Sequence, residues 1–114
     1  MRTNFQMEYE NITMTRGDTL SFNVEVYDQN EDPITADTVF FTCKKRLVHD
    51  DNIFQKSLGA GITQDDGLIT VRVAPEDTAE VEAGLYFYDC QIGVDSDIYT
   101  VMKGILTIEQ DVTF

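Results

Sequence analysis

Few side chains in this sequence are suited to nucleophilic or metal chemistry. The one histidine, His49, lies in a polar stretch, and the two cysteines, Cys43 and Cys90, stand far apart rather than in a CxxC pair. A nucleophile needs a base beside it, and zinc needs three or four Cys or His ligands at fixed spacing. Because these residues match neither pattern, we expect a protein that is not an enzyme and needs no cofactor or metal.

Carboxylates are the abundant reactive groups, with 21 Asp plus Glu among 114 residues. Asp65-Asp66 and Asp95-Ser96-Asp97 offer oxygen ligands of the kind that calcium prefers, but neither has the DxDxDG spacing. Asp side chains also form turns by bonding to nearby backbone, and we interpret both segments as turns. Nothing in the sequence brings two carboxylates to the separation that glycoside hydrolysis requires.

The charge balance excludes two classes of partner. Eight Lys plus Arg against 21 Asp plus Glu give a formal charge of −13, which repels nucleic-acid phosphates and anionic membrane surfaces. No apolar run approaches the roughly 18 residues of a membrane span, and the first residues lack the apolar core of a signal peptide. We therefore expect no nucleic-acid or membrane partner, no signal peptide, and a chain made in the cytoplasm.

Alternation of apolar and polar residues with period two dominates the chain. Leu20, Phe22, Val24 and Val26 share one face of a run whose intervening residues are polar, as in a half-buried strand. The same signal predicts strands over residues 20–27, 38–46, 68–74, 84–94 and 98–109, with weaker candidates over 9–14 and 52–58, which are the expected sheet edges.

Two of these runs are apolar on both sides. Phe40 opposes Val39 and Phe41, so both faces of the run over residues 38–46 are partly apolar. In the run over residues 84–94, one alternating set contains Tyr86, Tyr88, Cys90, Ile92 and Val94, and the other contains Leu85, Phe87, Asp89 and Gln91.

Turn signals separate the strands. Asp65-Asp66-Gly67 supplies the positive φ of a tight hairpin, and only residues 75–82, which begin with Pro75, could hold a helix of about one turn. About seven strands without a long amphipathic helix predict an all-β, antiparallel sandwich.

Tyr88 and the cysteines bear on the kind of sandwich. Tyr88 stands two residues before Cys90, the spacing of the tyrosine corner in immunoglobulin-like domains. In an antibody-type domain, Cys90 would pair with a cysteine on the second strand, where Phe22 and Val24 take the core face here. Cys43 falls on the third strand, so we expect both cysteines to be unpaired core residues.

Several short motifs occur in a recognisable order along the chain. They are residues 12–22 (ITMTRGDTLSF), 32–34 (DPI), 39–44 (VFFTCK), 54–56 (FQK), 67–69 (GLI), 74–78 (APEDT), 84–89 (GLYFYD) and 101–104 (VMKG). Over roughly residues 10–112 the chain resembles small structural proteins of tailed phages and prophages of Gram-positive bacteria. It looks like the immunoglobulin-like N-terminal domain of upper baseplate proteins.

The resemblance implies a fold and a role. The fold is a single immunoglobulin-like antiparallel β-sandwich of about seven strands over residues 9–114, preceded by an N-terminal tail over residues 1–8. The role is that of a non-enzymatic virion structural protein of the baseplate, tail or head, assembled in the host cytoplasm and then part of the virion. Its partners would be other phage structural proteins, and a homo-oligomer is left open.

The alternative is a carbohydrate- or surface-binding β-sandwich module. Its candidate stacking residues are Tyr9, Tyr27, Tyr86, Phe87 and Tyr99. The sequence contains no tryptophan, on which sugar-binding platforms depend heavily, and this disfavours the alternative.

Five residues are the candidates for protein contact. Phe5 and Met7 are large apolar residues in the N-terminal tail, which we expect to be ordered by strand addition to another copy or a partner. Lys44, Lys45 and Arg46 form the one basic cluster, and they are either a solvated strand end or a contact for an acidic neighbour.

Overall fold

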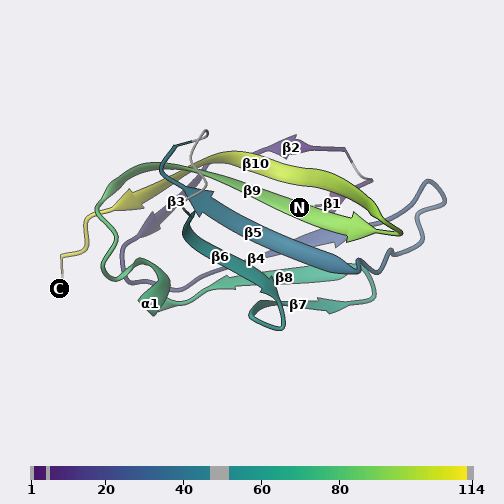
Figure 1. The fold of residues 1–114 in the computed structure, drawn as a ribbon, viewed down its shortest axis with the longest axis horizontal. Helices are drawn as coiled ribbons and strands as arrows, with labels where there is room; N and C mark the ends of the chain where they lie inside the picture. Colours follow the sequence, from purple (N-terminus) through teal and green to yellow (C-terminus); the bar gives the residue numbers. More distant parts are fainter. Residues whose placement is uncertain (1, 5, 47–51, 113–114) are drawn as a thin grey trace.

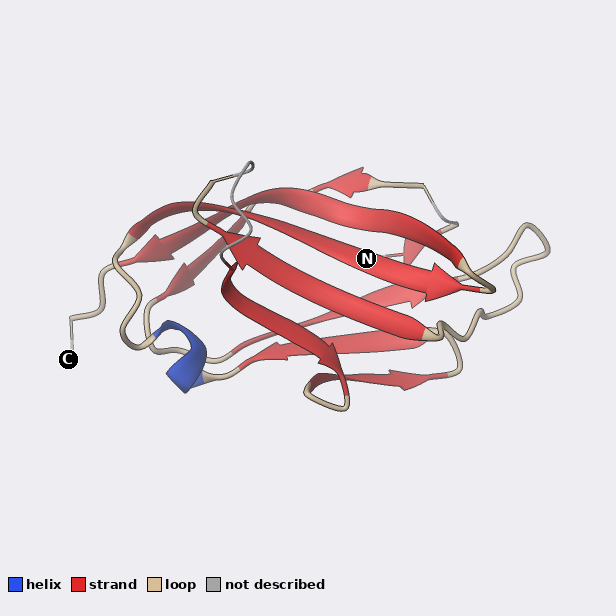
Figure 2. Ribbon diagram, in the orientation of Figure 1, coloured by secondary structure: helices blue, strands red, loops and turns tan. Residues whose placement is uncertain are grey.

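The structure is a computed structural model, and it describes residues 2–4, 6–46 and 52–112. Nearly all of its regular structure is β, which confirms the all-β prediction (Figures 1 and 2). A short helix, α1, spans Pro75–Thr78. The strands are β1 (Arg2–Thr3), β2 (Glu8–Tyr9), β3 (Ile12–Thr15), β4 (Leu20–Val26), β5 (Thr38–Lys44), β6 (Asn52–Leu58), β7 (Gly61–Asp65), β8 (Leu68–Val73), β9 (Gly84–Val94) and β10 (Asp97–Glu109).

The strands form one curled sheet that folds into two layers. One layer contains β4, β8 and β7 in that order, and the other contains β6, β5, β9 and β10. The layers join where Ser57 and Leu58 of β6 pair with Gly61 and Ile62 of β7. In Figure 1, β5, β9 and β10 run side by side in the nearer layer, with β4 and β8 behind them.

The sheet differs from the expected antiparallel arrangement in two respects. It is mixed, because β1 pairs in parallel with β4, β2 and β3 with β10, and β6 with β7. It also has more strands than about seven, because the predicted run over residues 9–14 is divided between β2 and β3, and β1 and β7 are added. In β7, Ile62 is the one buried apolar residue, which is too little for a period-two signal.

The core lies between the layers and follows the predicted alternation on β4, β5, β8 and β9. Phe41 of β5 is fully buried, and its ring centroid lies 5.4 Å from that of Phe22, 6.1 Å from that of Phe54 and 5.3 Å from that of Tyr88. On β10 a bulge between Thr100 and Met102 breaks the alternation. Consequently Val101 and Met102, which are adjacent in sequence, are both buried.

The N-terminal segment crosses β10 closely between β2 and β3. The Glu10 N–H donates to the Lys103 carbonyl at 3.0 Å, and the buried Tyr88 hydroxyl donates to the Glu10 carbonyl. A Cβ at Gly104 would lie well inside van der Waals contact of the Glu10 carbonyl oxygen. A glycine at this position is therefore what lets the N-terminal segment follow the edge of β10.

The tyrosine whose hydroxyl bonds to the backbone just before its own strand is Tyr86, not Tyr88. The Tyr86 hydroxyl donates to the Glu82 carbonyl four residues upstream, whereas Tyr88 reaches Glu10. The predicted tyrosine corner at Tyr88 is therefore wrong in position. Both tyrosines lie on the same buried face of β9. The spacing to Cys90 predicts Tyr88, but which tyrosine bonds back depends on the path of the chain before the strand, which the spacing does not reveal.

The turns have the backbone conformations that their residues predict. Asp66 (φ 47°) and Gly67 (φ 79°) connect β7 to β8, and Asp95 (φ 51°) and Ser96 (φ 73°) connect β9 to β10. The predicted single helical turn is α1, which begins at Pro75. These connections pair β9 with β10 from Gly84 and Ile108 to Val94 and Asp97, with one shift of register at the bulge between Thr100 and Met102.

Candidate interaction face

One outer face of the curled sheet carries most of the exposed apolar side chains. It is the outer side of β5, β9 and β10 with the adjoining β2 and β6, and we call it the β9 face. Because side chains alternate along a strand, the residues between the buried ones point away from the core. Among the described residues seven large apolar side chains are exposed, and five of them lie on this face: Tyr9, Phe40, Leu85, Phe87 and Ile98.

The strand register arranges the β9 face in rows. Phe87 of β9 has Lys44 of β5 on one side and Ile105 of β10 on the other. In the next row, Asp89 lies beside Lys103. A hollow of about 210 Å³ opens between these rows, lined by Thr42, Lys44, Phe87, Tyr88, Asp89 and Lys103.

Asp89 is the half-buried charge at the centre of the face. Burial raises the pKa of its carboxyl above the ordinary value, and the neighbouring Lys44 and Lys103 act in the opposite direction. With two lysines and one carboxylate the centre of the face carries a net charge of +1, whereas the whole chain carries −13. The face is therefore apolar, of mixed charge, and unlike the acidic remainder of the surface.

The outer face of β4 and β8 is polar by comparison. Leu68 is its one large apolar side chain that is exposed in the described structure. Its outward positions are Ser21, Asn23 and Glu25 on β4 and Leu68, Thr70 and Arg72 on β8. The two outer faces therefore differ in the described structure, and of the two it is the β9 face that carries the aromatic residues enriched in protein contacts.

The predicted basic cluster is divided by the fold. Lys44 lines the hollow of the β9 face, whereas the Lys45 ammonium lies 4.6 Å from the centroid of the Tyr86 ring. Arg46, just after β5, is exposed. Of the three, Lys44 is the one that the structure brings together with the exposed apolar residues.

The N-terminal candidates lie in a segment that is partly in the sheet. Arg2–Thr3 pairs with Glu25 and Val26 of β4, and Thr3 is buried. Met7 is half-buried, and Phe5 lies outside the described residues.

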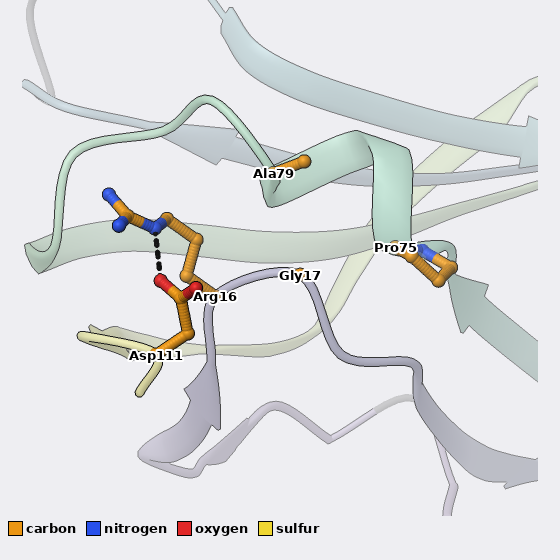
Figure 3. A pocket seen from close by; sticks show the side chains of 5 residues that line it. All are labelled: Arg16, Gly17, Pro75, Ala79 and Asp111. Carbon is orange, nitrogen blue, oxygen red and sulfur yellow. Dashed lines mark hydrogen bonds and ion pairs between the residues drawn. The ribbon is translucent and has the colours of Figure 1, made fainter. Parts of the chain in front are cut away.

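A second hollow, of about 290 Å³, lies where α1, the β3–β4 turn and the chain after β10 meet (Figure 3). Arg16 Nε donates to Asp111 Oδ1 at 2.8 Å, and Arg16 Nη1 donates to the Val81 carbonyl at 3.4 Å. Because the Asp111 carboxylate neutralises the Arg16 guanidinium, this hollow is a weak candidate for binding a charged ligand. The contacts of Arg16 instead hold three parts of the chain together. Its other lining residues are Gly17, Pro75 and Ala79.

The thiols are placed for packing rather than reactivity. Cys43 and Cys90 are buried and unpaired, as expected for core residues. Burial raises the pKa of each thiol to about 12, so both are protonated at neutral pH and poor nucleophiles. His49 lies outside the described residues, and within the described ranges no three His, Cys, Asp or Glu side chains gather as a metal site.

The residues named for sugar stacking do not form one platform. Tyr86 is buried, and Tyr27 and Tyr99 are half-buried. Tyr9 and Phe87 are exposed, and both belong to the β9 face.

Sequence reasoning did not assign Phe40, Leu85, Asp89 and Lys103 to a site. The signal was present, because both alternating sets of the runs over residues 38–46 and 84–94 are partly apolar. A strand of that kind buries one side in the core and leaves apolar side chains exposed on the other, which is a signal of a contact surface.

Comparisons with known protein families and with curated proteins find no match to this chain. In the described part of the chain, no helix has the length and apolar character needed to cross a membrane.

Proposed function

We propose that this chain is a non-enzymatic structural protein of a tailed phage or prophage particle, which docks on other particle proteins through the β9 face. The observation that carries the proposal is the gathering of Tyr9, Phe40, Leu85, Phe87 and Ile98 on one side of the molecule. Exposed apolar side chains gathered on one face are typical of a protein–protein contact. Baseplate, tail and head positions are all compatible with this role.

We further propose that the fold is an immunoglobulin-like sandwich. The order β4, β8, β7 corresponds to strands B, E and D of such a domain, and the order β6, β5, β9, β10 corresponds to strands C′, C, F and G. The bond from Tyr86 back to Glu82 has the form of a tyrosine corner. The short β6–β7 pairing, which joins the layers on one side, departs from that plan. The sequence motifs that resemble upper baseplate proteins support the same assignment.

The proposal is tested by incorporation into particles. A tagged copy is expressed in a host that carries the phage, particles are purified by density, and the chain is quantified by mass spectrometry. We expect the wild-type chain in the particles. Phe87→Asp places a charge in the apolar contact without disturbing the core, because Phe87 is 37% exposed. It should lower incorporation at least about tenfold, a loss typical of a hot-spot residue.

The matched control is Leu68→Asp, at a similarly exposed residue on the opposite face. It should leave incorporation unchanged, and circular dichroism should show both variants folded. Absence of the wild-type chain from purified particles overturns the proposal. Binding of the purified chain to immobilised glycans, lost in Tyr9→Ala, would favour the carbohydrate-binding alternative instead.

A further inference from the structure

We propose that the β9 face docks on the same face of a second copy of this chain, about a twofold axis running along the sheet between β9 and β10. This inference rests on the proposed docking role of the face and names the partner. Its basis is the register of β9 against β10, which makes the face complementary to itself.

A twofold axis between two neighbouring strands exchanges them. Each outward residue of β9 then faces, on the second copy, the residue that is its own neighbour on β10. Asp89 is registered with Lys103, and Phe87 with Ile105. In the dimer Asp89 therefore meets Lys103 of the second copy, and Phe87 meets Ile105 of the second copy. Opposite charges and apolar surfaces are matched twice, once on each side of the axis.

Three further registered pairs lie on this face, Leu85–Thr107, Gln91–Thr100 and Gly93–Ile98, and none of them brings like charges together. Gln91 Nε2 donates to Thr100 Oγ1 at 3.3 Å within the chain, so these side chains are polar partners already. Other positions of the axis match less well. An axis along β9 itself would place Asp89 against Asp89 of the second copy. An axis between β5 and β9 would place Asp89 against Thr42, because these two residues are registered across those strands.

The charge distribution also favours a second copy over a strongly charged partner. A basic protein would bind the acidic remainder of this chain, which carries −13 overall, rather than a centre formed by Lys44, Asp89 and Lys103. A face-to-face dimer brings together the least acidic surfaces of the two copies. Repulsion between the distant acidic surfaces is screened, since the Debye length is about 8 Å at physiological ionic strength.

The size of the face suits a dimer. Four strands about 4.8 Å apart, each of about nine residues at ~3.4 Å per residue, cover roughly 600 Å² in projection. The accessible surface of corrugated side chains exceeds the projection, and a standard interface buries about 800 Å² per partner. The area of the face is therefore of the order that a dimer interface requires.

The test is a charge exchange read by sedimentation equilibrium of the full chain. Asp89→Lys alone places lysine against Lys103 of the second copy, and Lys103→Asp alone places aspartate against Asp89. Each variant alone should raise the dimer dissociation constant at least about tenfold, because like charges then face each other twice. Mixing the two variants restores both attractive pairs in a heterodimer, so the mixture should associate within about threefold of wild type. Arg72→Asp, on the opposite face, is the control and should leave the dimer unchanged.

The outcomes separate this inference from the docking role. A wild-type chain that stays monomeric, or a mixture that fails to associate although both variants melt as wild type, overturns the twofold contact. If such a monomer still enters particles and Phe87→Asp prevents it, the docking role holds with a different partner. If the dimer forms but Asp89→Lys does not weaken it, the copies meet on another surface and the inference fails.

Discussion

The crossing of the N-terminal segment over β10 allows a sharp test of the fold. Gly104→Ala adds a methyl group where the Glu10 carbonyl oxygen already lies, and that oxygen is backbone that cannot rotate away as a side chain would. The N-terminal segment around Glu10 must therefore move away from β10. We therefore expect the contacts that hold it to be lost together, while the two layers of the sheet stay folded.

The size of the effect follows from those contacts. The Glu10 N–H bond to Lys103 and the Ile105 N–H bond to Asn11 Oδ1 are 3.0 and 3.1 Å long, and each contributes about 1 kcal/mol net. The Tyr88 hydroxyl, in a side chain that is 4% exposed, loses its acceptor and is left unpaired, which costs about 1–3 kcal/mol. The expected total is about 3–5 kcal/mol, which is below the ~6–17 kcal/mol typical of a domain of this length.

A double-mutant cycle with Tyr88→Phe, measured by urea unfolding, separates this mechanism from general strain. Tyr88→Phe in the wild type should cost about 1 kcal/mol, because the Glu10 carbonyl loses its donor. In the Gly104→Ala background it should instead recover about 1–3 kcal/mol, because that bond is already broken and the substitution removes the unpaired buried hydroxyl. The control background is Gly59→Ala, where φ is +83° but no atom lies near the added Cβ, so Tyr88→Phe should keep its full cost there. Additive effects of Gly104→Ala and Tyr88→Phe would refute the reasoning.

Three further predictions concern individual side chains. Burial raises the pKa of Asp89, so this group favours folding below its ordinary pKa and the contribution is lost as pH rises through the raised value. As pH is raised above the ordinary pKa of an aspartate, Asp89→Asn should therefore gain stability relative to wild type, measured by urea midpoints, and a relative loss contradicts the assignment. Lys56 Nζ lies 2.8 Å from Asp77 Oδ2 and both side chains are mostly buried, so Lys56→Met should cost about 1–3 kcal/mol and adding Asp77→Asn should recover most of it. Cys43 and Cys90 should react with a thiol reagent only after unfolding and then give two thiols in the absence of reductant, whereas fewer would indicate a disulfide.

The long strands could be predicted because every second residue of each strand faces the core and is apolar. In β4 and β9 the apolar set at alternating positions is the set that the structure buries, from Val24 and Val26 to Tyr86 and Cys90. Short pairings escape this signal. β1 and β2 have two residues each, and they are strands only because β4 and β10 lie beside them. The bulge before Met102 is likewise set by pairing with β9, so the pattern along β10 cannot reveal it.

The candidate site was harder to predict, because it depends on which side of a two-sided strand faces out. In β9, Leu85 and Phe87 are as apolar as the buried Tyr86 and Tyr88. The choice is made by contacts of the tyrosine hydroxyls, because Tyr86 finds an acceptor four residues upstream at Glu82 and Tyr88 finds one far away in the sequence at Glu10. Phenylalanine and leucine have no such group to satisfy and tolerate the solvent side. The sequence could therefore indicate an unusual strand, but the neighbours decide which residues form the contact surface.

The fold also explains why we assign contact to a face rather than to an edge. The segments expected to be edges are both protected. β2 and β3 lie along β10 and cover its outer edge over part of its length. β6 carries Lys56 toward the interior, where the ammonium pairs with Asp77 of α1. An inward-pointing charge on an outer strand opposes pairing with a further strand, because the added strand would have to bury or displace it. With these edges protected, the surface most available to a partner is the row of exposed side chains on β5, β9 and β10, where Phe87 and Asp89 stand at the centre.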